Sequence, residues 1–257
     1  MLSFGQGIHI AWRTSGTRIP FFTEQFSVLL EMLRLNQVKL NHNFDEAFLR
    51  GEITRLLNRN RIFKGALIHL LFMADKNKGP IRSSGLYMAT ENLSEEKFIL
   101  HSRGIKLGWL KDHTHAGDWL IQGIGNYHPI HMLWEQELKQ LNCDAGYFTD
   151  KNQKITECSD ASLFVIQGTR LYTPSLNLGL TPRAIRKVIL RLAPTLGLQV
   201  IETELLEPAH LDAADEIFLA DDHTGIRWIV GHGEIRYFRK YSELFNTIIN
   251  REWAAAN

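Results

Sequence analysis

The stretch "GLTPRAIRKVILRLAPTLG", from Gly179 to Gly197, gives the clearest local signal in the chain. Thr181 followed by Pro182 is typical of an N-cap and a first helical position, so a helix is predicted to begin there. Apolar residues at helical spacing predict its buried stripe: Ile185, Val188, Ile189 and Leu192. The basic residues between them are expected to face solvent: Arg183, Arg186, Lys187 and Arg191. A helix start after a glycine can bind an anion, although most capped helices hold only water or a neighbouring loop.

Strand patterns flank this helix on both sides. Before it, "AGYFTDKNQKITE" and "ASLFVIQGTRLYTP" each predict a β-hairpin, with turns at 150–153 and at Gln167-Gly168. After it, residues 198–238 predict a strand, a short helix and two more strands. Upstream, "PIHMLWEQELKQLN" predicts a helix with Pro129 in its first turn and this apolar face: Met132, Leu133, Leu138 and Leu141.

The first half of the chain has a different pattern. Apolar residues at helical spacing predict two helices, one with Phe26, Leu29, Leu30 and Leu33 and a second with Phe44, Phe48, Ile53 and Leu57. The runs "GALIHLLFMA", "SGLYMATE" and "KFILHSR" predict strands. The stretch from Gly104 to Gly125 has several glycines and no sustained period, which indicates a domain junction. We therefore predict an α+β fold with a small N-terminal α+β domain, residues 1–115, and a larger C-terminal domain, residues 116–257.

Length and composition indicate an ordinary folded protein. The 257 residues are 44% hydrophobic, which suffices for one large core or two moderate ones. A net charge of +1, from 29 basic and 28 acidic residues, gives no electrostatic reason to expect nucleic acid or an anionic membrane as partner. The opening "MLSFGQGIHIAWR" lacks the pattern of an export signal, and no window approaches the roughly eighteen apolar residues of a membrane span. Because there are only two cysteines, Cys143 and Cys158, we expect no disulfide framework and a cytoplasmic location.

The order of the patterns in the second half is informative. "KITE" is followed by "LFVIQGTRLYTP", the capped helix, "LGLQVIETEL" and "ADEIFLADDHTGI". This order resembles the second domain of the class IV aminotransferases, pyridoxal-phosphate enzymes of fold type IV that include branched-chain and D-amino acid aminotransferases and aminodeoxychorismate lyase. "GQGIHIAWRTSGTRIPFFTEQFSVLL" is similar to that family's opening, so the resemblance extends over almost the whole chain. It implies a larger domain like a β-barrel with helices, a homodimer, and pyridoxal 5′-phosphate as the family's cofactor.

The residue that the resemblance makes most important is a lysine. In the family it holds the cofactor as an imine and then moves the substrate proton. It stands three residues before an asparagine that is often followed by tyrosine, and these match Asn126 and Tyr127 here. The position three residues earlier is Gly123, which has no side chain. The nearest upstream lysines, Lys106 and Lys111, would require a different register, so the resemblance points to a family member without its cofactor-binding lysine.

Other cofactor positions implied by the resemblance are retained. Glu157 matches the acid that pairs with the pyridine nitrogen of the cofactor. Gly179, Leu180 and Thr181 match the loop whose backbone amides cradle the phosphate. Both have structural alternatives: Glu157 as a strand-end carboxylate satisfied by a backbone amide or an arginine, and Thr181 as only a helix cap.

Several further positions depart from the family pattern. Gln25 and Val28 stand where the resemblance implies a histidine and a phosphate-holding arginine. Pro182 replaces an arginine after the phosphate loop, and Asn177 replaces a leucine that packs on the ring. The pair Asp221-Asp222 follows a strand at the place expected for the phosphate, where two carboxylates would repel a dianion by roughly several kcal/mol.

Two other kinds of chemistry have candidate residues around the expected pocket. Its sequence neighbourhood contains four histidines, with Asp118 and Asp222 as possible carboxylates: His113, His115, His128 and His131. Their spacings match no zinc motif, so we expect no metal site. Cys158 beside Glu157, with His223 opposite, is a conceivable thiol site, but a small buried cysteine is the commoner arrangement.

Three functional hypotheses follow. In the first, the chain is a degenerate class IV aminotransferase that has lost imine chemistry, binds no cofactor, and persists as a binding or regulatory protein whose remodelled pocket is formed by Asn126, Tyr127, His128, Asn177, Asp222 and His223. In the second, it is an active pyridoxal-phosphate aminotransferase or lyase acting on amino acids through Lys106 or Lys111. In the third, it is an enzyme or ligand-binding protein without this cofactor, with acid and base groups among His128, Glu157, Asp222 and His223. The small-molecule ligand, and whether any catalysis occurs, stay open.

Overall fold

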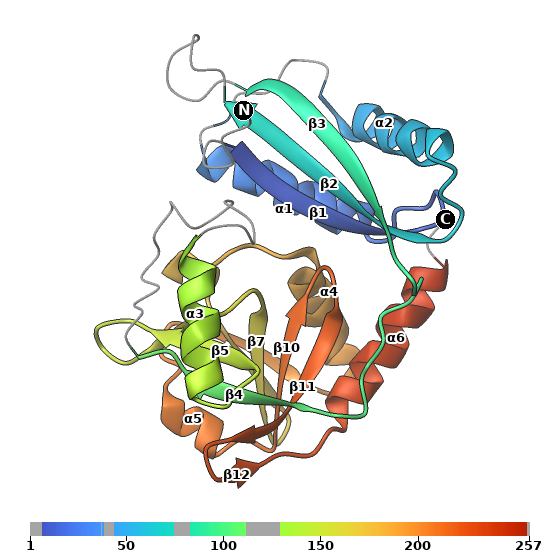
Figure 1. Cartoon of the computed structure of the whole chain (residues 1–257). Coiled ribbons are helices and arrows are strands. Elements are labelled where there is room, and N and C mark those ends of the chain that lie inside the picture. The colour runs from blue at the N-terminus through green and yellow to red at the C-terminus, as the bar shows by residue number, and fades with distance from the viewer. Residues whose placement is uncertain (1–6, 37, 39–43, 75–82, 112–128, 256–257) are drawn as a thin grey trace. The chain divides into compact units, whose positions relative to one another are not determined.

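The computed structural model describes residues 7–36, 38, 44–74, 83–111 and 129–255 (Figure 1). Contacts divide the chain into two compact units. Among the described residues, the first contains 7–98 and 250–255, and the second contains 99–111 and 129–249. The predicted domain boundary, between residues 115 and 116, lies outside the described residues. The strand that precedes it, β4 (Ile105–Trp109), pairs within the sheet of the second unit.

The first unit is a three-stranded antiparallel sheet covered on one face by two helices. The strands lie in the order β1-β2-β3, with α1 against β1 and α2 against β3 (Figure 1). Burial alternates along the middle strand, where Ile68, Leu70 and Phe72 are buried. The bounds are β1 Gly7–Ser15, α1 Phe22–Leu35, α2 Glu46–Arg59, β2 Gly65–Ala74 and β3 Ser83–Asn92. Both helices and two of the three predicted strands are therefore confirmed, whereas "KFILHSR" contains no strand.

The helices of this unit bury most of the predicted apolar faces. In α1, Phe26, Leu29 and Leu33 are buried, but Leu30 is 40% exposed. The buried stripe of this helix is therefore narrower than its run of leucines suggests. In α2, Ile53 and Leu57 are fully buried and Phe48 is exposed. The side chain of Asp45 accepts a hydrogen bond from the amide of Phe48 at 2.7 Å, so α2 has the carboxylate cap that its N-terminal amides require.

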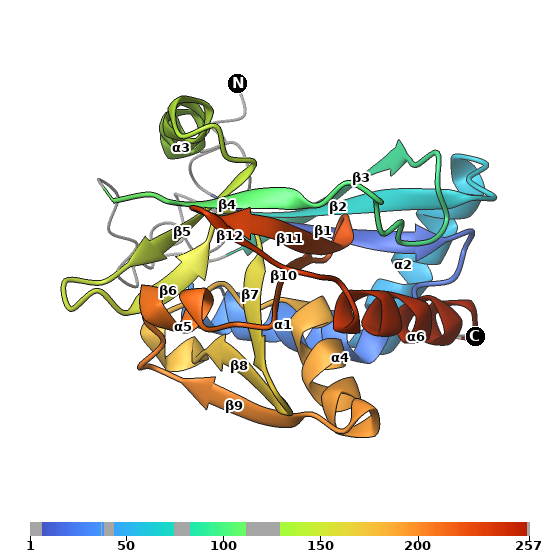
Figure 2. The same ribbon diagram turned by 90° about the horizontal axis from the view of Figure 1, so that it is seen from below.

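The second unit is built on a nine-stranded mixed sheet that curls into a half-barrel (Figures 1 and 2). The order is β6-β5-β4-β11-β10-β7-β8-β9, with β12 on β11. Besides β4, the strands are β5 Ala145–Thr149, β6 Ile155–Cys158, β7 Ser162–Gln167, β8 Arg170–Pro174, β9 Gln199–Thr203, β10 Glu216–Asp221, β11 Gly225–His232 and β12 Ile235–Arg236. The two predicted hairpins are β5-β6 and β7-β8, both antiparallel.

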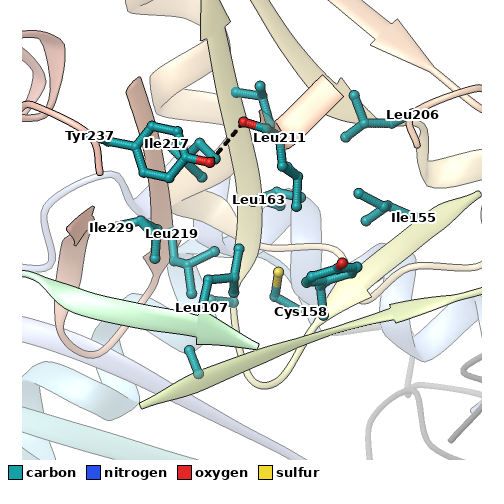
Figure 3. Packing of buried hydrophobic residues seen from close by; sticks show 14 residues of the cluster. Leu107, Ile155, Cys158, Leu163, Leu206, Leu211, Ile217, Leu219, Ile229 and Tyr237 are labelled. Carbon is teal, nitrogen blue, oxygen red and sulfur yellow. Dashed lines mark hydrogen bonds between the residues drawn. The ribbon is translucent and has the colours of Figure 1, made fainter. Parts of the chain in front are cut away.

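A hydrophobic core fills the inside of this curled sheet. Figure 3 shows side chains from strands far apart in the sequence meeting there, among them Leu107, Ile155 and Leu219, all 1% exposed or less. Tyr237 enters the same core and its hydroxyl donates to the carbonyl oxygen of Leu211 at 2.8 Å. Because a buried hydroxyl without a partner is costly, this bond explains how a tyrosine is tolerated among leucines and isoleucines.

The remaining helices lie around this sheet. They are α3 Pro129–Gln140, α4 Ala184–Leu192, α5 Pro208–Asp212 and α6 Tyr241–Ala255, and the last lies beyond the elements that the sequence patterns predict. The predicted apolar face of α3 is partly wrong: Met132, Leu133 and Leu141 are exposed, and Trp134 and Leu138 are the buried residues. Among the described residues, no helix has the length and apolar character needed to cross a membrane.

Candidate functional site

The N-terminus of α4 is the centre of the candidate site, and it begins later than predicted. The helix starts at Ala184, and Arg183 stands at the N-cap position. The side chain of Arg183 makes no capping hydrogen bond. Thr181 is therefore not the N-cap, because Pro182 and Arg183 extend the loop before the helix begins. Before this loop, Gly179 adopts a left-handed φ of 79°, which glycine permits without a steric penalty. The predicted buried stripe is confirmed: Ile185, Val188, Ile189 and Leu192 are 4% exposed or less.

Glu157, at the inner end of β6, is tied to the loop before α4. Its side chain is 5% exposed, and Oε1 lies 2.6 Å from Nη1 of Arg183, whose own side chain is 12% exposed. The backbone amide of Thr181 donates to both carboxylate oxygens, at 3.3 and 3.4 Å. Burial by itself lowers the pKa of Arg183, but the neighbouring Glu157 carboxylate raises it above its usual value overall. These contacts match the structural alternative for Glu157, a strand-end carboxylate satisfied by a backbone amide or an arginine.

Asp222 supplies the acceptor atoms at the start of α4. Its Oδ1 accepts from the amide of Ile185 at 2.6 Å, and its Oδ2 accepts from the amide of Ala184 at 3.1 Å. These amides are among the first four of the helix, which have no partner within the helix. Burial raises the pKa of Asp222, and the two amides and the Arg183 guanidinium oppose that rise. The carboxyl group thus performs the capping function that the sequence had assigned to Thr181.

The neighbouring Asp221 closes the turn between β10 and β11. One oxygen accepts from the amides of His223 and Thr224, at 2.9 and 2.7 Å, and the other accepts from the Thr224 hydroxyl. Arg227 lies 3.5 Å from the same carboxylate. Asp221 therefore has a turn-forming role, which leaves Asp222 as the acid of this pair that reaches the helix.

A second arginine of α4 is buried beside the first. Arg186 is 2% exposed, and it donates to the hydroxyl of Thr173 at 3.2 Å, the carbonyl of Pro174 at 2.8 Å and the carboxylate of Glu202 at 2.8 Å. Burial lowers its pKa, and Glu202 opposes that effect. The expectation that Arg183 and Arg186 face solvent is therefore wrong, because strands β6 and β9 bring carboxylates to them. Spacing within one helix contains no signal of these partners.

Between the two arginines and the sheet lies a small hollow of about 10 Å³, close to the space that a single water molecule needs. Hydroxyl groups of threonine and serine line it together with the charged residues and three leucines: Thr156, Glu157, Ser162, Leu163, Thr173, Leu176, Leu180, Thr181, Arg183 and Arg186. The lining of the hollow is therefore largely polar and contains one carboxylate and two guanidinium groups.

Residues 31–229 match the family model described as amino-transferase class IV. The chain belongs to the class IV aminotransferase family. Over 106 residues, the chain is 32% identical to a chloroplastic branched-chain amino acid aminotransferase 2 from Humulus lupulus. This segment is 41% of this chain and 26% of that protein. Over 88% of this chain the identity to a mitochondrial branched-chain-amino-acid aminotransferase 1 from Arabidopsis thaliana is 23%, and the match spans 62% of that protein. The chain thus spans less than two thirds of either relative.

Solved structures show that the class IV aminotransferase fold is shared. A branched-chain aminotransferase from Thermoproteus uzoniensis superposes with a TM-score of 0.83 at 15% identity, over 98% of this chain and 87% of that one. A Legionella pneumophila protein assigned as a 4-amino-4-deoxychorismate lyase gives a TM-score of 0.80 at 17% identity, over 96% and 91% of the two chains. At these identities the likeness establishes the fold alone, and it confirms the predicted fold type IV architecture.

The class IV family normally uses pyridoxal 5′-phosphate, and the described residues do not fit that group as they are arranged here. The carboxylate expected to hold the ring nitrogen, Glu157, is engaged by Arg183. In the loop expected to cradle the phosphate, the amide of Thr181 donates to Glu157 at 3.3 and 3.4 Å. At the start of the helix that follows, the amides of Ala184 and Ile185 donate to Asp222. The absence of a bound cofactor remains a prediction.

The remaining predicted pocket residues are placed as follows. Leu180 is buried at the hollow, whereas Asn177 is exposed and donates to Glu204 at 3.0 Å, away from the lining. His223 is half-buried in the turn after Asp221. In the first unit, Gln25 and Val28 are both buried, and Gln25 donates to the carbonyl of Pro20 at 2.6 Å. The other predicted residues lie outside the described residues: Gly123, Asn126, Tyr127, His128, His113, His115 and Asp118.

Two alternative chemistries receive no support from the described part of the chain. Within it, no group of three or more histidine, cysteine or acidic side chains could hold a metal ion. Cys158 is 1% exposed, and burial together with the adjacent Glu157 raises the pKa of its thiol. Since a thiolate is the reactive form, this cysteine has the properties of a buried structural residue. Lys106 and Lys111 are exposed on and after β4, and the ammonium of Lys111 lies 4.8 Å from the centre of the Trp109 ring.

Proposed function

We propose that this chain is a class IV aminotransferase-fold protein that has lost imine chemistry with pyridoxal 5′-phosphate and now acts as a binding or regulatory protein. The observation that carries the proposal is the buried pair of Glu157 and Arg183, with 2.6 Å between Oε1 and Nη1. An acid that already holds a guanidinium is not available to keep a pyridine nitrogen protonated. Gly123 at the expected lysine position supports the same conclusion from the sequence.

The charge arrangement around α4 supports the proposal independently. A cofactor phosphate carries close to two negative charges, and helix N-terminal amides are its usual partners. Here Asp222 accepts from both amides, and the acids Glu157 and Asp221 lie in the same unit beside it. A phosphate would have to displace one carboxylate and approach others, which is electrostatically unfavourable at short range.

An absorbance spectrum from 300 to 500 nm, recorded on protein incubated with pyridoxal 5′-phosphate, tests the proposal. The sample is then reduced with borohydride and digested for mass spectrometry. We expect no imine band above that of a denatured control, and no stoichiometric adduct on any lysine. A band with a single reduced adduct, above all on Lys106 or Lys111, would refute the proposal and favour the second candidate.

That second candidate is an active aminotransferase or lyase acting on amino acids, and family membership is the observation that favours it. The relatives named above are branched-chain aminotransferases, so a branched-chain amino acid with a 2-oxo acid is the first substrate pair to assay. We expect no turnover. The homodimer implied by the resemblance also remains a proposal, and light scattering coupled to size exclusion measures it directly.

A further inference from the structure

Two oppositely charged side chains of the second unit, Asp222 and Arg183, make buried hydrogen bonds near the start of α4. Asp222 presents two oxygens to the amides of Ala184 and Ile185, at 3.1 and 2.6 Å. A planar or tetrahedral oxyanion bound at a helix start uses the same donors, at similar distances. The carboxyl group therefore has the geometry of a bound anion, supplied by the turn that follows β10.

Arg183 similarly occupies the carboxylate of Glu157. Its Nη1 lies 2.6 Å from Oε1 of Glu157, and both side chains are almost entirely buried. A guanidinium is a flat cation that presents N–H donors in its own plane. A protonated nitrogen heterocycle is also a flat cation with an in-plane N–H donor, so the two compete for one carboxylate.

We propose that Asp222 and Arg183 form an internal ligand, with the carboxyl group in place of a phosphate and the guanidinium in place of a pyridinium ring. The inference rests on the proposed function and specifies how phosphorylated pyridines are excluded from the site. The two groups are within one chain, so their effective concentration at the site exceeds that of a free ligand. An external phosphorylated pyridine must displace both, whereas each fragment of it must displace only one.

The two halves of the internal ligand can be tested separately with compounds that form no imine. Inorganic phosphate tests Asp222, pyridoxine tests Arg183, and pyridoxine 5′-phosphate tests both, since none of the three has an aldehyde. Binding is measured by calorimetry and by the shift of the melting temperature at constant ionic strength. The variants are Asp222→Ala, Arg183→Ala and the double variant, each compared with the wild-type chain.

Matched controls remove the same groups elsewhere in the second unit. Asp215→Ala loses a carboxylate that accepts from the amide of Gly168 at 2.6 Å, without touching α4. Arg170→Ala loses an arginine that donates to Tyr172 at 3.5 Å. Neither control is expected to gain affinity for any of the three compounds.

We expect Asp222→Ala to bind phosphate at least about tenfold more tightly than wild type, and Arg183→Ala to gain similarly for pyridoxine. The double variant is expected to bind pyridoxine 5′-phosphate most tightly. If an alanine variant fails to fold, Asp222→Asn and Arg183→Gln neutralise the same groups with smaller expected gains. The proposal is overturned if folded variants bind no better than the controls, or if the wild type binds as tightly as the variants. An imine on the wild-type chain would instead overturn the proposed function, so the two failures are distinct.

Discussion

Replacement of Arg183 by methionine is the sharpest test of how the site is held together. The guanidinium is 12% exposed and its partner Glu157 is 5% exposed, so solvent cannot replace the lost partner. Removal of one member of a buried ion pair costs about 3–5 kcal/mol. The amide and hydroxyl of Thr181 still donate to Glu157, at 3.3 to 3.5 Å, so we expect the lower end, about 3 kcal/mol.

Urea unfolding followed by circular dichroism measures this loss as a lower midpoint at constant slope. The matched control is Arg55→Met, which breaks the pair with Glu52 at 2.5 Å on α2, where the arginine side chain is 73% exposed. An exposed pair of this kind contributes less than about 1 kcal/mol. The double variant Glu157→Gln/Arg183→Met is expected to recover most of the stability, because no buried charge is left alone. A loss for Arg183→Met no larger than that for Arg55→Met would refute the reasoning.

Three further outcomes are expected. Burial raises the folded-state pKa of Asp222 above its usual value of 3.8, so wild type should lose stability relative to Asp222→Asn as the pH rises from 3.8 through that raised value, as measured by urea midpoints. Glu216, 3% exposed, accepts from the amides of residues 240–242 at the start of α6, so Glu216→Ala should cost about 2–4 kcal/mol by the same assay, and a smaller loss than Arg55→Met would contradict this role. A thiol reagent should modify Cys143 in the native protein and Cys158 only after unfolding, and equal rates would disprove the burial assignment.

The fold was predictable where its signals are local. The α4 stripe of Ile185, Val188 and Ile189 follows from spacing alone, and the two hairpins follow from turn residues between strand-forming runs. Helix α6 also has a local signal, since Phe245, Ile249 and Trp253 repeat every four residues and are all buried. A hydrophobic period of this kind predicts which face of a helix is buried, whatever packs against that face.

The site was predictable only in part, because its contacts join distant segments. Glu157 was identified, but its partner was assigned to solvent, since the spacing of Arg183 and Arg186 matches that of an exposed helix face. Their acceptors are 26 and 16 residues away in the sequence, on β6 and β9. Asp222 was expected to repel a phosphate, yet its bonds to the α4 amides required knowledge that β10 ends beside that helix.

The contacts of Asn250 and Trp253 have a consequence for the order in which the protein is built. Trp253 stacks edge-on against Phe21 and Phe98, with ring centres 5.7 and 4.8 Å apart, and Asn250 hydrogen-bonds the backbone of Phe98 in both directions. All of these residues belong to the first unit. During synthesis, the packing of the first unit is therefore complete only after Asn250, 152 residues beyond Phe98, has left the ribosome, and a nascent chain stalled before residue 250 would leave that packing unfinished.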